Sequence, residues 1–380
     1  MHIALVTTSY PDEQSGSEAA GGFVADFAQA LSKHARVSVV AATASASSVR
    51  DEGAVNVHRF MVRRWPLSLL RPYNPTDWWA IYATLRDGRQ TLQDVVENDR
   101  PDYILALWAL PSGYWARSML KQYGIPYGVW ALGSDIWELG RIPILRNFLR
   151  STLNDADRCF ADGLKLADDV TELSGKPCGF LPSSRLLANQ DPPDVADAPP
   201  YRLAFLGRWH HNKGIDILMD ALTLLSNEDW ANLAEVRIHG GGPLSAEVYK
   251  VAHELRAIGR PVKVGGYLDK WHAAELIAWT DYMVIPSRIE SIPVIFSDAA
   301  QLRRPMIATP VGDLPRLFNA NGFGVLATDS TASTFASAIR QAMNVSANLF
   351  RPGLEATMTT FDLSVSVRKM VGLIGNCDSS

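Results

Sequence analysis

Short apolar runs alternate along this chain with longer segments in which apolar residues recur at helical spacing. The periodic segments, such as 214–225 and 273–280, predict helices. The apolar runs are typical of buried strands and cover residues 2–8, 37–44, 103–108, 127–132, 158–163, 202–207, 235–240, 262–266, 281–287 and 305–310. Buried strands alternating with crossover helices predict an α/β protein with parallel sheets, which bind ligands beyond the carboxyl ends of their strands.

A proline-rich segment interrupts this alternation. Residues 183–200 contain four prolines and little apolar periodicity, which predicts a linker. We therefore expect an N-terminal domain over 1–182 and a C-terminal domain over 201–355. The remaining segment, 356–380, is expected to form a helix that can pack back on the N-terminal domain.

Composition and charge exclude several classes of protein. The 47% of hydrophobic residues among 380 excludes wholesale disorder, and a net charge of −4 argues against a generally basic nucleic-acid binder. The three cysteines, Cys159, Cys178 and Cys377, form neither a CxxC motif nor a disulfide framework. The N-terminus lacks the basic start of a signal peptide, and the apolar stretch 103–115 is too short to span a bilayer. A cytoplasmic protein is expected.

Positive charge gathers where the strand 202–207 gives way to a helix beginning near Gly214. Cations are disfavoured at a helix N-terminus unless an anion lies among them. The cluster therefore predicts an anion site, although an ordinary solvated turn is the simpler alternative. Its members are Arg208, His210, His211 and Lys213.

Glycines follow two further strands of this half. The strand at 235–240 leads into Gly240–Gly242 and Pro243, and the run 262–268 ends in glycines and contains Tyr267. Glycine lets a backbone approach a ligand closely. The pattern is not GxGxxG, so a dinucleotide site is not indicated, and a plain turn remains open.

Two carboxylates flank the start of a helix expected near Pro293. Glu290 and Ser291 lie just ahead of it, where they serve either as helix caps or as hydrogen-bond partners of sugar hydroxyls. Asp298 lies deeper in the mainly apolar helix, where a carboxylate needs a partner such as a ribose hydroxyl.

Together these segments resemble the retaining glycosyltransferases of family 4, which have the GT-B fold. The resemblance covers nearly the whole chain and is strongest over 202–326. It implies two Rossmann-like, doubly wound parallel-sheet domains facing a central cleft. The motifs that carry it are GRWHHNKG, HGGGP, IPSRIESIP, PMIATPVGDLP and GFGVLA.

The resemblance assigns roles to the residues singled out above. Arg208 and Lys213 would hold the donor diphosphate and Glu290 would contact the donor sugar, which makes these three the catalytic residues. Asp298 would bind the ribose at a position where the family has glutamate. Gly21 and Gly22 would cover the donor phosphates from a loop before a helix, although a plain helix start is the alternative. The other donor-binding residues implied are Gly207, Gly241, Gly242, Pro243, Tyr267, Ser291, Ile292 and Pro293.

The segment WALGSDIWELG (130–140) resembles the family's His-Gly-Ser-Asp segment, with Leu132 in place of the histidine. This departure indicates a variant sugar pocket or lost activity. The residues expected to line the acceptor or sugar pocket are Trp108, Gly133, Ser134 and Asp135.

The function implied is metal-independent, hexosyltransferase-type transfer from a nucleotide-diphosphate sugar to a glycan or polyprenyl-linked acceptor, with no cofactor. Surface polysaccharide or glycolipid biosynthesis would use such a reaction. No Asp-x-Asp pair lies where a phosphate-bound cation would be expected. Two alternatives remain open: a non-catalytic nucleotide-sugar-binding partner of a glycosyltransferase complex, and a GT-B nucleotide-sugar epimerase.

Two segments mix arginines with large apolar residues, 58–79 and 140–153, where Arg146 and Arg150 share a helix face. Such segments can lie on an anionic membrane. An exposed basic face over a core stripe explains them equally well. Peripheral contact with the inner face of the plasma membrane is thus an expectation, and nucleic acid is not an expected partner.

Overall fold

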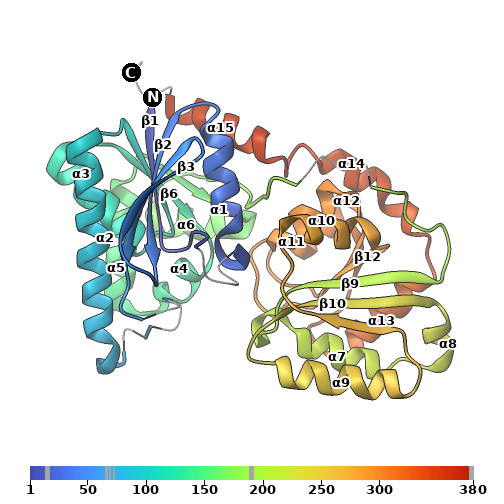
Figure 1. The fold of residues 1–380 in the computed structure, drawn as a ribbon. Coiled ribbons are helices and arrows are strands. Elements are labelled where there is room, and N and C mark those ends of the chain that lie inside the picture. Colours follow the sequence, from blue (N-terminus) through green and yellow to red (C-terminus); the bar gives the residue numbers. More distant parts are fainter. Residues whose placement is uncertain (13–17, 65–66, 68–69, 72, 188–191, 376–380) are drawn as a thin grey trace. The chain divides into compact units, whose positions relative to one another are not determined.

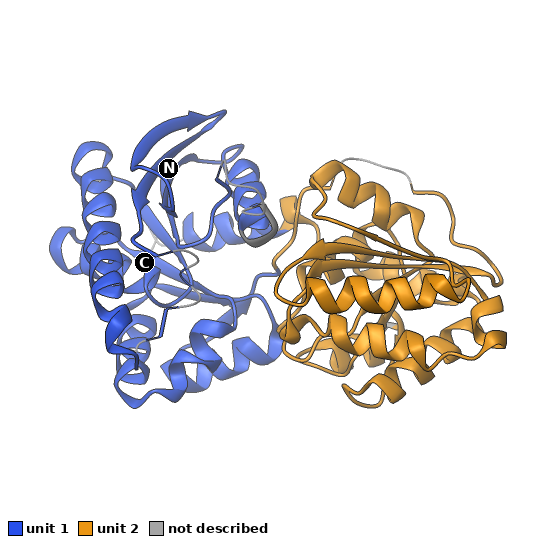
Figure 2. Ribbon diagram, turned by 60° about the horizontal axis from the view of Figure 1, so that its bottom comes forward, with its two compact units in different colours: residues 1–182, 366–380 blue, residues 183–365 orange. Residues whose placement is uncertain are grey.

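Each half of the chain forms an open β-sheet, as the alternation of apolar runs predicts. A computed structural model describes residues 1–12, 18–64, 67, 70–71, 73–187 and 192–375. The chain divides into unit 1, residues 1–182 and 366–380, and unit 2, residues 183–365 (Figure 2). Cys377 lies outside the described residues.

The sheet of unit 1 has eight strands in the order β3-β4-β2-β1-β5-β6-β7-β8. Only β3 runs antiparallel to its neighbour β4; the other pairs are parallel. The polar edge strand β3 and its neighbour β4 were not expected, nor was the three-residue β8, because none is a plain apolar run. The strands are β1 His2–Thr7, β2 Arg36–Thr43, β3 Ser48–Glu52, β4 Val55–Met61, β5 Tyr103–Leu107, β6 Tyr127–Ala131, β7 Arg158–Ala161 and β8 Cys178–Phe180.

Helices cover both faces of this sheet (Figure 1). One face packs against α2 (Trp78–Asp99), α3 (Ser112–Tyr123), α5 (Pro143–Asp155) and α6 (Leu164–Ser174). Helix α1 (Glu18–Leu31) covers the other face, where Phe27 packs on Trp130 with ring centroids 4.8 Å apart. The short α4 (Ser134–Trp137) follows β6.

The sheet of unit 2 is parallel throughout, with the strand order β11-β10-β9-β12-β13-β14. Its strands are β9 Tyr201–Arg208, β10 Leu233–Gly241, β11 Val262–Gly265, β12 Tyr282–Ile285, β13 Met306–Ala308 and β14 Gly324–Leu326. Helices lie on both faces (Figure 1): α7 Ile215–Thr223, α9 Ser245–Ala257 and α13 Ala332–Met343 on one, α10 Lys270–Trp279, α11 Val294–Gln301 and α12 Leu314–Asn321 on the other. The short α8 (Asn227–Ala231) precedes β10. The doubly wound fold class predicted from the sequence is confirmed.

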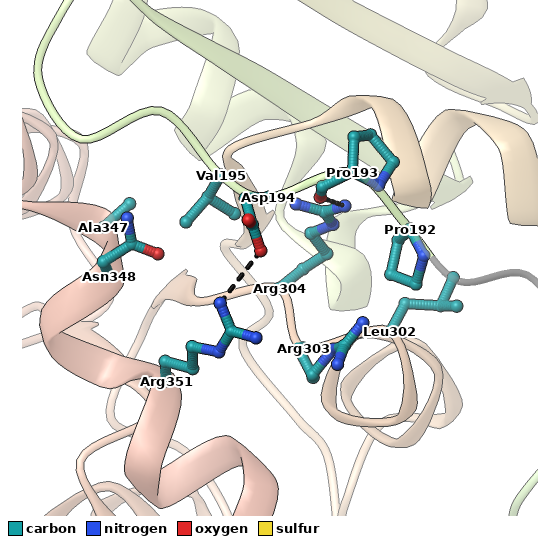
Figure 3. A pocket seen from close by; sticks show the side chains of 10 residues that line it. All are labelled: Pro192, Pro193, Asp194, Val195, Leu302, Arg303, Arg304, Ala347, Asn348 and Arg351. Carbon is teal, nitrogen blue, oxygen red and sulfur yellow. Dashed lines mark hydrogen bonds and ion pairs between the residues drawn. The ribbon is translucent and has the colours of Figure 1, made fainter.

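The described part of the proline-rich segment contains no helix or strand. It packs on the rest of unit 2, whereas a linker without such contacts was expected. The backbone N–H of Ala196 donates to Asp281 Oδ1 (2.9 Å). Arg304 is buried and donates to the carbonyl of Pro193 (2.5 Å), next to an ion pair of Arg351 with Asp194 (2.9 Å; Figure 3). Burial lowers the pKa of Arg304 to about 10.

The last helices follow α13. Helix α14 (Arg351–Thr357) lies in unit 2, and α15 (Leu363–Gly375) belongs to unit 1 from Ser366 onward. Within the described ranges, we find no helix whose length and apolar character would let it cross a bilayer.

Candidate functional site

The strand order of unit 2 reverses between β9 and β12. Strands β10 and β11 follow on one side of β9, whereas β13 and β14 follow on the far side of β12. The loops that leave the carboxyl ends of β9 and β12 therefore diverge from a shared crevice, the usual ligand site of open parallel sheets. The basic turn after β9 and the Glu290 loop after β12 both lie there.

Arg288 ties these two loops together. Its backbone N–H donates to the carbonyl of Asn212 (2.9 Å), and its guanidinium donates to the carbonyl of His211 (2.8 Å). The same guanidinium forms a bidentate pair with Asp216 (2.7 Å to each oxygen). Burial would raise the pKa of Asp216, but Arg288 outweighs it, and the pKa is lowered. Sequence reasoning missed Arg288, although it lies within the IPSRIESIP motif.

Gly214 allows the two loops to approach. Its φ is +64°, and a Cβ there would lie 1.8 Å from the carbonyl oxygen of Pro286. Only glycine fits both the left-handed backbone and this contact. Helix α7 begins directly after it, as the sequence predicts.

Lys213 and Glu290 form an ion pair across the crevice. Glu290 Oε1 also accepts a hydrogen bond from Ser287 Oγ (3.0 Å). The sequence analysis assigns Lys213 to the donor diphosphate and Glu290 to the donor sugar. The structure places the two side chains in contact. The crevice thus offers an ammonium group to an anion and a carboxylate to hydroxyl groups. Arg208 is the exposed last residue of β9, at the start of the same turn.

The glycine-rich loop after β10 packs on the basic turn through Trp209. The backbone N–H of Trp209 donates to the carbonyl of Gly241 (2.8 Å), and its carbonyl accepts from Leu244 (3.1 Å). A Cβ on Gly242 would lie 2.6 Å from the Trp209 carbonyl oxygen. Sequence reasoning missed Trp209, whose signal was a large apolar residue in an otherwise basic turn.

Tyr267 and Gly207 support the same loop. The Tyr267 hydroxyl donates to the carbonyl of Gly241 (2.8 Å), and its ring occupies the space that a side chain at 241 would need. Gly207 pairs with Gly240, where a Cβ would lie 1.9 Å from the Gly207 carbonyl oxygen. Pro243 is exposed on the loop.

The residues after Glu290 lead into α11, which begins at Val294 with Pro293 as its N-cap. Ile292 is buried. Ser291 is buried too, and its carbonyl accepts from the N–H of Asp313 (3.2 Å). The Ser291 Oγ has no hydrogen-bond partner among the residues that the structure describes.

Asp298 has a protein partner where a ribose was expected. Its side chain is wholly buried and forms an ion pair with Arg185, whose Nε lies 2.8 Å from Asp298 Oδ2. The ribose contact stays a prediction, and a bound donor would share this carboxylate with Arg185. Arg185 belongs to the segment expected to be a linker, so its partnership was not foreseen.

Unit 1 has its own reversal of strand order, between β1 and β5. Trp108, directly after β5, has φ +68°, an unusual value for a large side chain. Its N–H donates to the carbonyl of Trp130 (2.9 Å) and its carbonyl accepts from Gly113 (3.2 Å). Strained backbone at such a position is typical of binding sites.

Asp135 joins the loops after β5 and β6 rather than lining a pocket. It is buried and accepts hydrogen bonds from the N–H groups of Ala109 (2.6 Å) and Leu132 (3.3 Å). Burial raises the pKa of Asp135 to about 6, against the opposing effect of these bonds. The carboxylate thus bonds to backbone N–H groups, and the sugar contact expected of Asp135 stays a prediction. Gly133 (φ +101°) precedes it, and Ser134 is exposed.

Gly21 and Gly22 lie inside α1, which begins at Glu18, and not in a loop before a helix. A Cβ on Gly21 would lie 2.8 Å from the backbone of Tyr10. The predicted placement is therefore wrong, and Gly21 instead allows α1 to pack closely on the segment after β1.

Residues 200–344 match the family model of glycosyl transferases group 1. This segment holds the whole crevice described above, from the basic turn to Glu290 and α11. The likeness to that family spans residues 200–344 of the chain.

Curated glycosyltransferases match parts of this chain. TuaC of Bacillus subtilis (strain 168), described as a teichuronic acid biosynthesis glycosyltransferase, is 27% identical over 254 residues, 63% of this chain and 60% of TuaC. The D-inositol 3-phosphate glycosyltransferase of Pseudarthrobacter chlorophenolicus is 30% identical over 162 residues, 42% of this chain and 38% of that protein. The match therefore spans less than two thirds of either relative.

Solved structures show that this chain has the GT-B fold. Sucrose-phosphate synthase from Thermosynechococcus elongatus superposes with a TM-score of 0.77 at 18% identity, covering 100% of this chain and 99% of that one. Anabaena Alr3699/HepE in complex with UDP-glucose gives 0.70 at 15% identity, covering 99% and 100%.

Proposed function

We propose that this chain is a retaining glycosyltransferase of family 4 that moves a sugar from a nucleotide-diphosphate sugar to a glycan or polyprenyl-linked acceptor. The observation that carries the proposal is the Lys213–Glu290 pair at the carboxyl edge of β9 and β12. The Lys213 ammonium group can bind a phosphate, and the Glu290 carboxylate can accept hydrogen bonds from sugar hydroxyls. Both lie within the group 1 segment.

Charge development on the leaving group accounts for the basic turn. As the bond from the sugar's anomeric carbon to the phosphate oxygen breaks, negative charge grows on the diphosphate. Lys213 and Arg208 neutralise this charge, so no metal ion is needed in the proposed reaction. Glu290 accepts hydrogen bonds from the sugar hydroxyls.

The acceptor oxygen then bonds to the same face of the anomeric carbon, which retains its configuration. The acceptor's proton passes to the departing phosphate oxygen, so the reaction balances without a protein nucleophile or base. In this scheme the residues of the crevice position the donor and stabilise charge. Leu132, where the family has histidine, therefore alters the sugar pocket without removing a chemical step.

The relatives support the donor and acceptor classes. Alr3699/HepE has been solved with UDP and with UDP-glucose, and TuaC is described as acting in teichuronic acid biosynthesis. Surface polysaccharide or glycolipid assembly would fit both. Trp108 and Gly133, at the carboxyl edge of unit 1, are proposed to help bind the acceptor.

The proposal is tested by nucleotide-dependent thermal stabilisation and by release of nucleoside diphosphate on turnover. A panel of nucleoside diphosphates and their sugars is used, with and without magnesium. A ligand at a hundred times its dissociation constant stabilises the fold by about 2.7 kcal/mol. Lys213→Ala should abolish this stabilisation, whereas Lys250→Ala, an exposed lysine on α9, should leave it unchanged. Stabilisation retained in Lys213→Ala would contradict the site.

A further inference from the structure

Two helices of unit 1 expose large apolar side chains at their first turns. Five residues have between 46% and 70% of their surface exposed: Trp78, Trp79 and Tyr82 on α2, and Ile144 and Phe148 on α5. The rings of Trp79 and Tyr82 stack, with centroids 5.9 Å apart. Helix α2 follows β4 and α5 follows β6, so both begin at the carboxyl edge of the sheet (Figure 1).

The first turns of α2 and α5 extend to nearly the same height along the helix axes, measured from their contacts with α3. Helix α3 packs between α2 and α5. A Cβ on Gly88 of α2 would lie 2.4 Å from the ring of Trp115 in α3. A Cβ on Gly113 of α3 would lie 2.7 Å from Thr152 of α5. Trp79 precedes Gly88 by nine residues and Ile144 precedes Thr152 by eight. At about 1.5 Å per residue, each start extends roughly 12–14 Å beyond its contact with α3.

Positive charge surrounds these apolar side chains. Asp77 is the one acidic residue between 60 and 86, and it is buried beside Arg64; none occurs between 139 and 154. The side chains of four exposed arginines form no ion pair within the part of the chain that the structure describes: Arg63, Arg71, Arg141 and Arg146. The backbone N–H of Arg71 donates to Asp77 Oδ2 (2.9 Å). The edge is therefore both apolar and strongly basic.

We propose that these five apolar residues and four arginines form one docking surface for an anionic phospholipid bilayer. Tryptophan and tyrosine rings favour the boundary between acyl chains and headgroups, and arginines pair with lipid phosphates. The two projecting helix starts at one level suit a planar partner.

Docking by this surface would turn the carboxyl edge of unit 1 toward the bilayer. The loops after β5 and β6, which carry Trp108 and Gly133, leave the same edge. A lipid-linked acceptor held in the bilayer would therefore present its headgroup next to them. This consequence for the acceptor rests on the proposed function; the docking itself rests on the surface.

Vesicle co-sedimentation of the full chain tests the docking. The vesicles contain phosphatidylcholine alone, or equal parts of phosphatidylcholine and phosphatidylglycerol. We expect binding to the anionic vesicles only, and its loss in about 0.5 M salt, where arginine–phosphate attraction is screened. The double substitution Trp79→Ser with Phe148→Ser should lower the partition coefficient by about tenfold.

Two further variants make the test specific. Trp271→Ser removes an equally exposed tryptophan from α10 of unit 2 and should leave vesicle binding unchanged. Arg141→Gln with Arg146→Gln removes charge without removing apolar surface, so it remains informative if the aromatic variant fails to fold. It should weaken binding to anionic vesicles by about tenfold.

Equal binding to neutral vesicles, no binding at all, or full binding by both surface variants would overturn the proposal. So would an aromatic variant that binds vesicles normally but loses turnover on a lipid-free glycan, because the surface would then be a glycan site. Nucleotide-dependent stabilisation is measured on the same samples. Its loss would indicate failure of the proposed function, and its presence without vesicle binding would indicate failure of the docking proposal alone.

Discussion

Lys213 and Glu290 form an ion pair although 77 residues separate them in the sequence. They meet because β9 and β12 are neighbours at the point where the strand order reverses. Each charge holds the other in place at the mouth of the crevice. A bound donor would replace this mutual pairing, with phosphate on the lysine and hydroxyls on the carboxylate.

Glu290→Gln separates donor binding from catalysis. The amide keeps the shape and one acceptor oxygen, so nucleotide-dependent stabilisation should survive. Turnover should fall by about 100-fold or more, since a charged contact to the reacting sugar is removed. Release of nucleoside diphosphate measures the effect. A variant with full activity would remove Glu290 from the mechanism.

Gly214→Ala should destabilise unit 2 and weaken nucleotide binding. The new Cβ would lie 1.8 Å from the Pro286 carbonyl oxygen, on a backbone with φ +64°. The strain should cost well over 1 kcal/mol, because the loops after β9 and β12 must separate. Thermal unfolding measures it. Gly266→Ala is the matched control, since a Cβ there meets nothing within 4 Å and should change stability little.

The sequence predicted the architecture because ten apolar runs correspond to strands of two buried parallel sheets. It missed β3, β4, β8 and β14, where polar or short segments carry no apolar run. It predicted the basic turn after β9 and it predicted Glu290, because charged residues that follow an apolar run can be recognised from the sequence alone. The sequence could not reveal Arg288 or Trp209 as the residues that join the loops.

Two carboxylates named in the sequence analysis have protein partners. Asp298 was expected to meet a ribose because a carboxylate in an apolar helix needs a partner, whereas Asp135 was assigned to the sugar pocket by the family resemblance. The structure supplies those partners from residues distant in sequence or from backbone: Ala109 for Asp135 and Arg185 for Asp298. Sequence alone shows the need for a partner and leaves open whether protein or ligand meets it.

Asp135→Asn should change how stability depends on pH. The folded pKa of Asp135 is raised to about 6, above its ordinary value, so the wild-type carboxyl favours folding most when protonated. Relative to Asp135→Asn, wild-type stability should therefore decline between about pH 4 and pH 6 and level off above it. The decline should be about 3 kcal/mol in total. Chemical denaturation across this range measures it, and parallel curves would contradict the burial of a charge at this position.

Arg185→Ala tests whether Asp298 is structural. Removing the arginine leaves a buried carboxylate without its counter-charge, which should destabilise unit 2 by about 3–5 kcal/mol. Arg351→Ala breaks exposed ion pairs with Asp194 and Glu355 and should change stability little. Thermal unfolding without ligand compares the two variants. Equal, small losses of stability would show that Asp298 does not depend on Arg185, and would favour a ribose hydroxyl as its partner. A large loss confined to Arg185→Ala means that the segment 183–200 is anchored to α11 by this pair, next to the crevice that begins at Glu290.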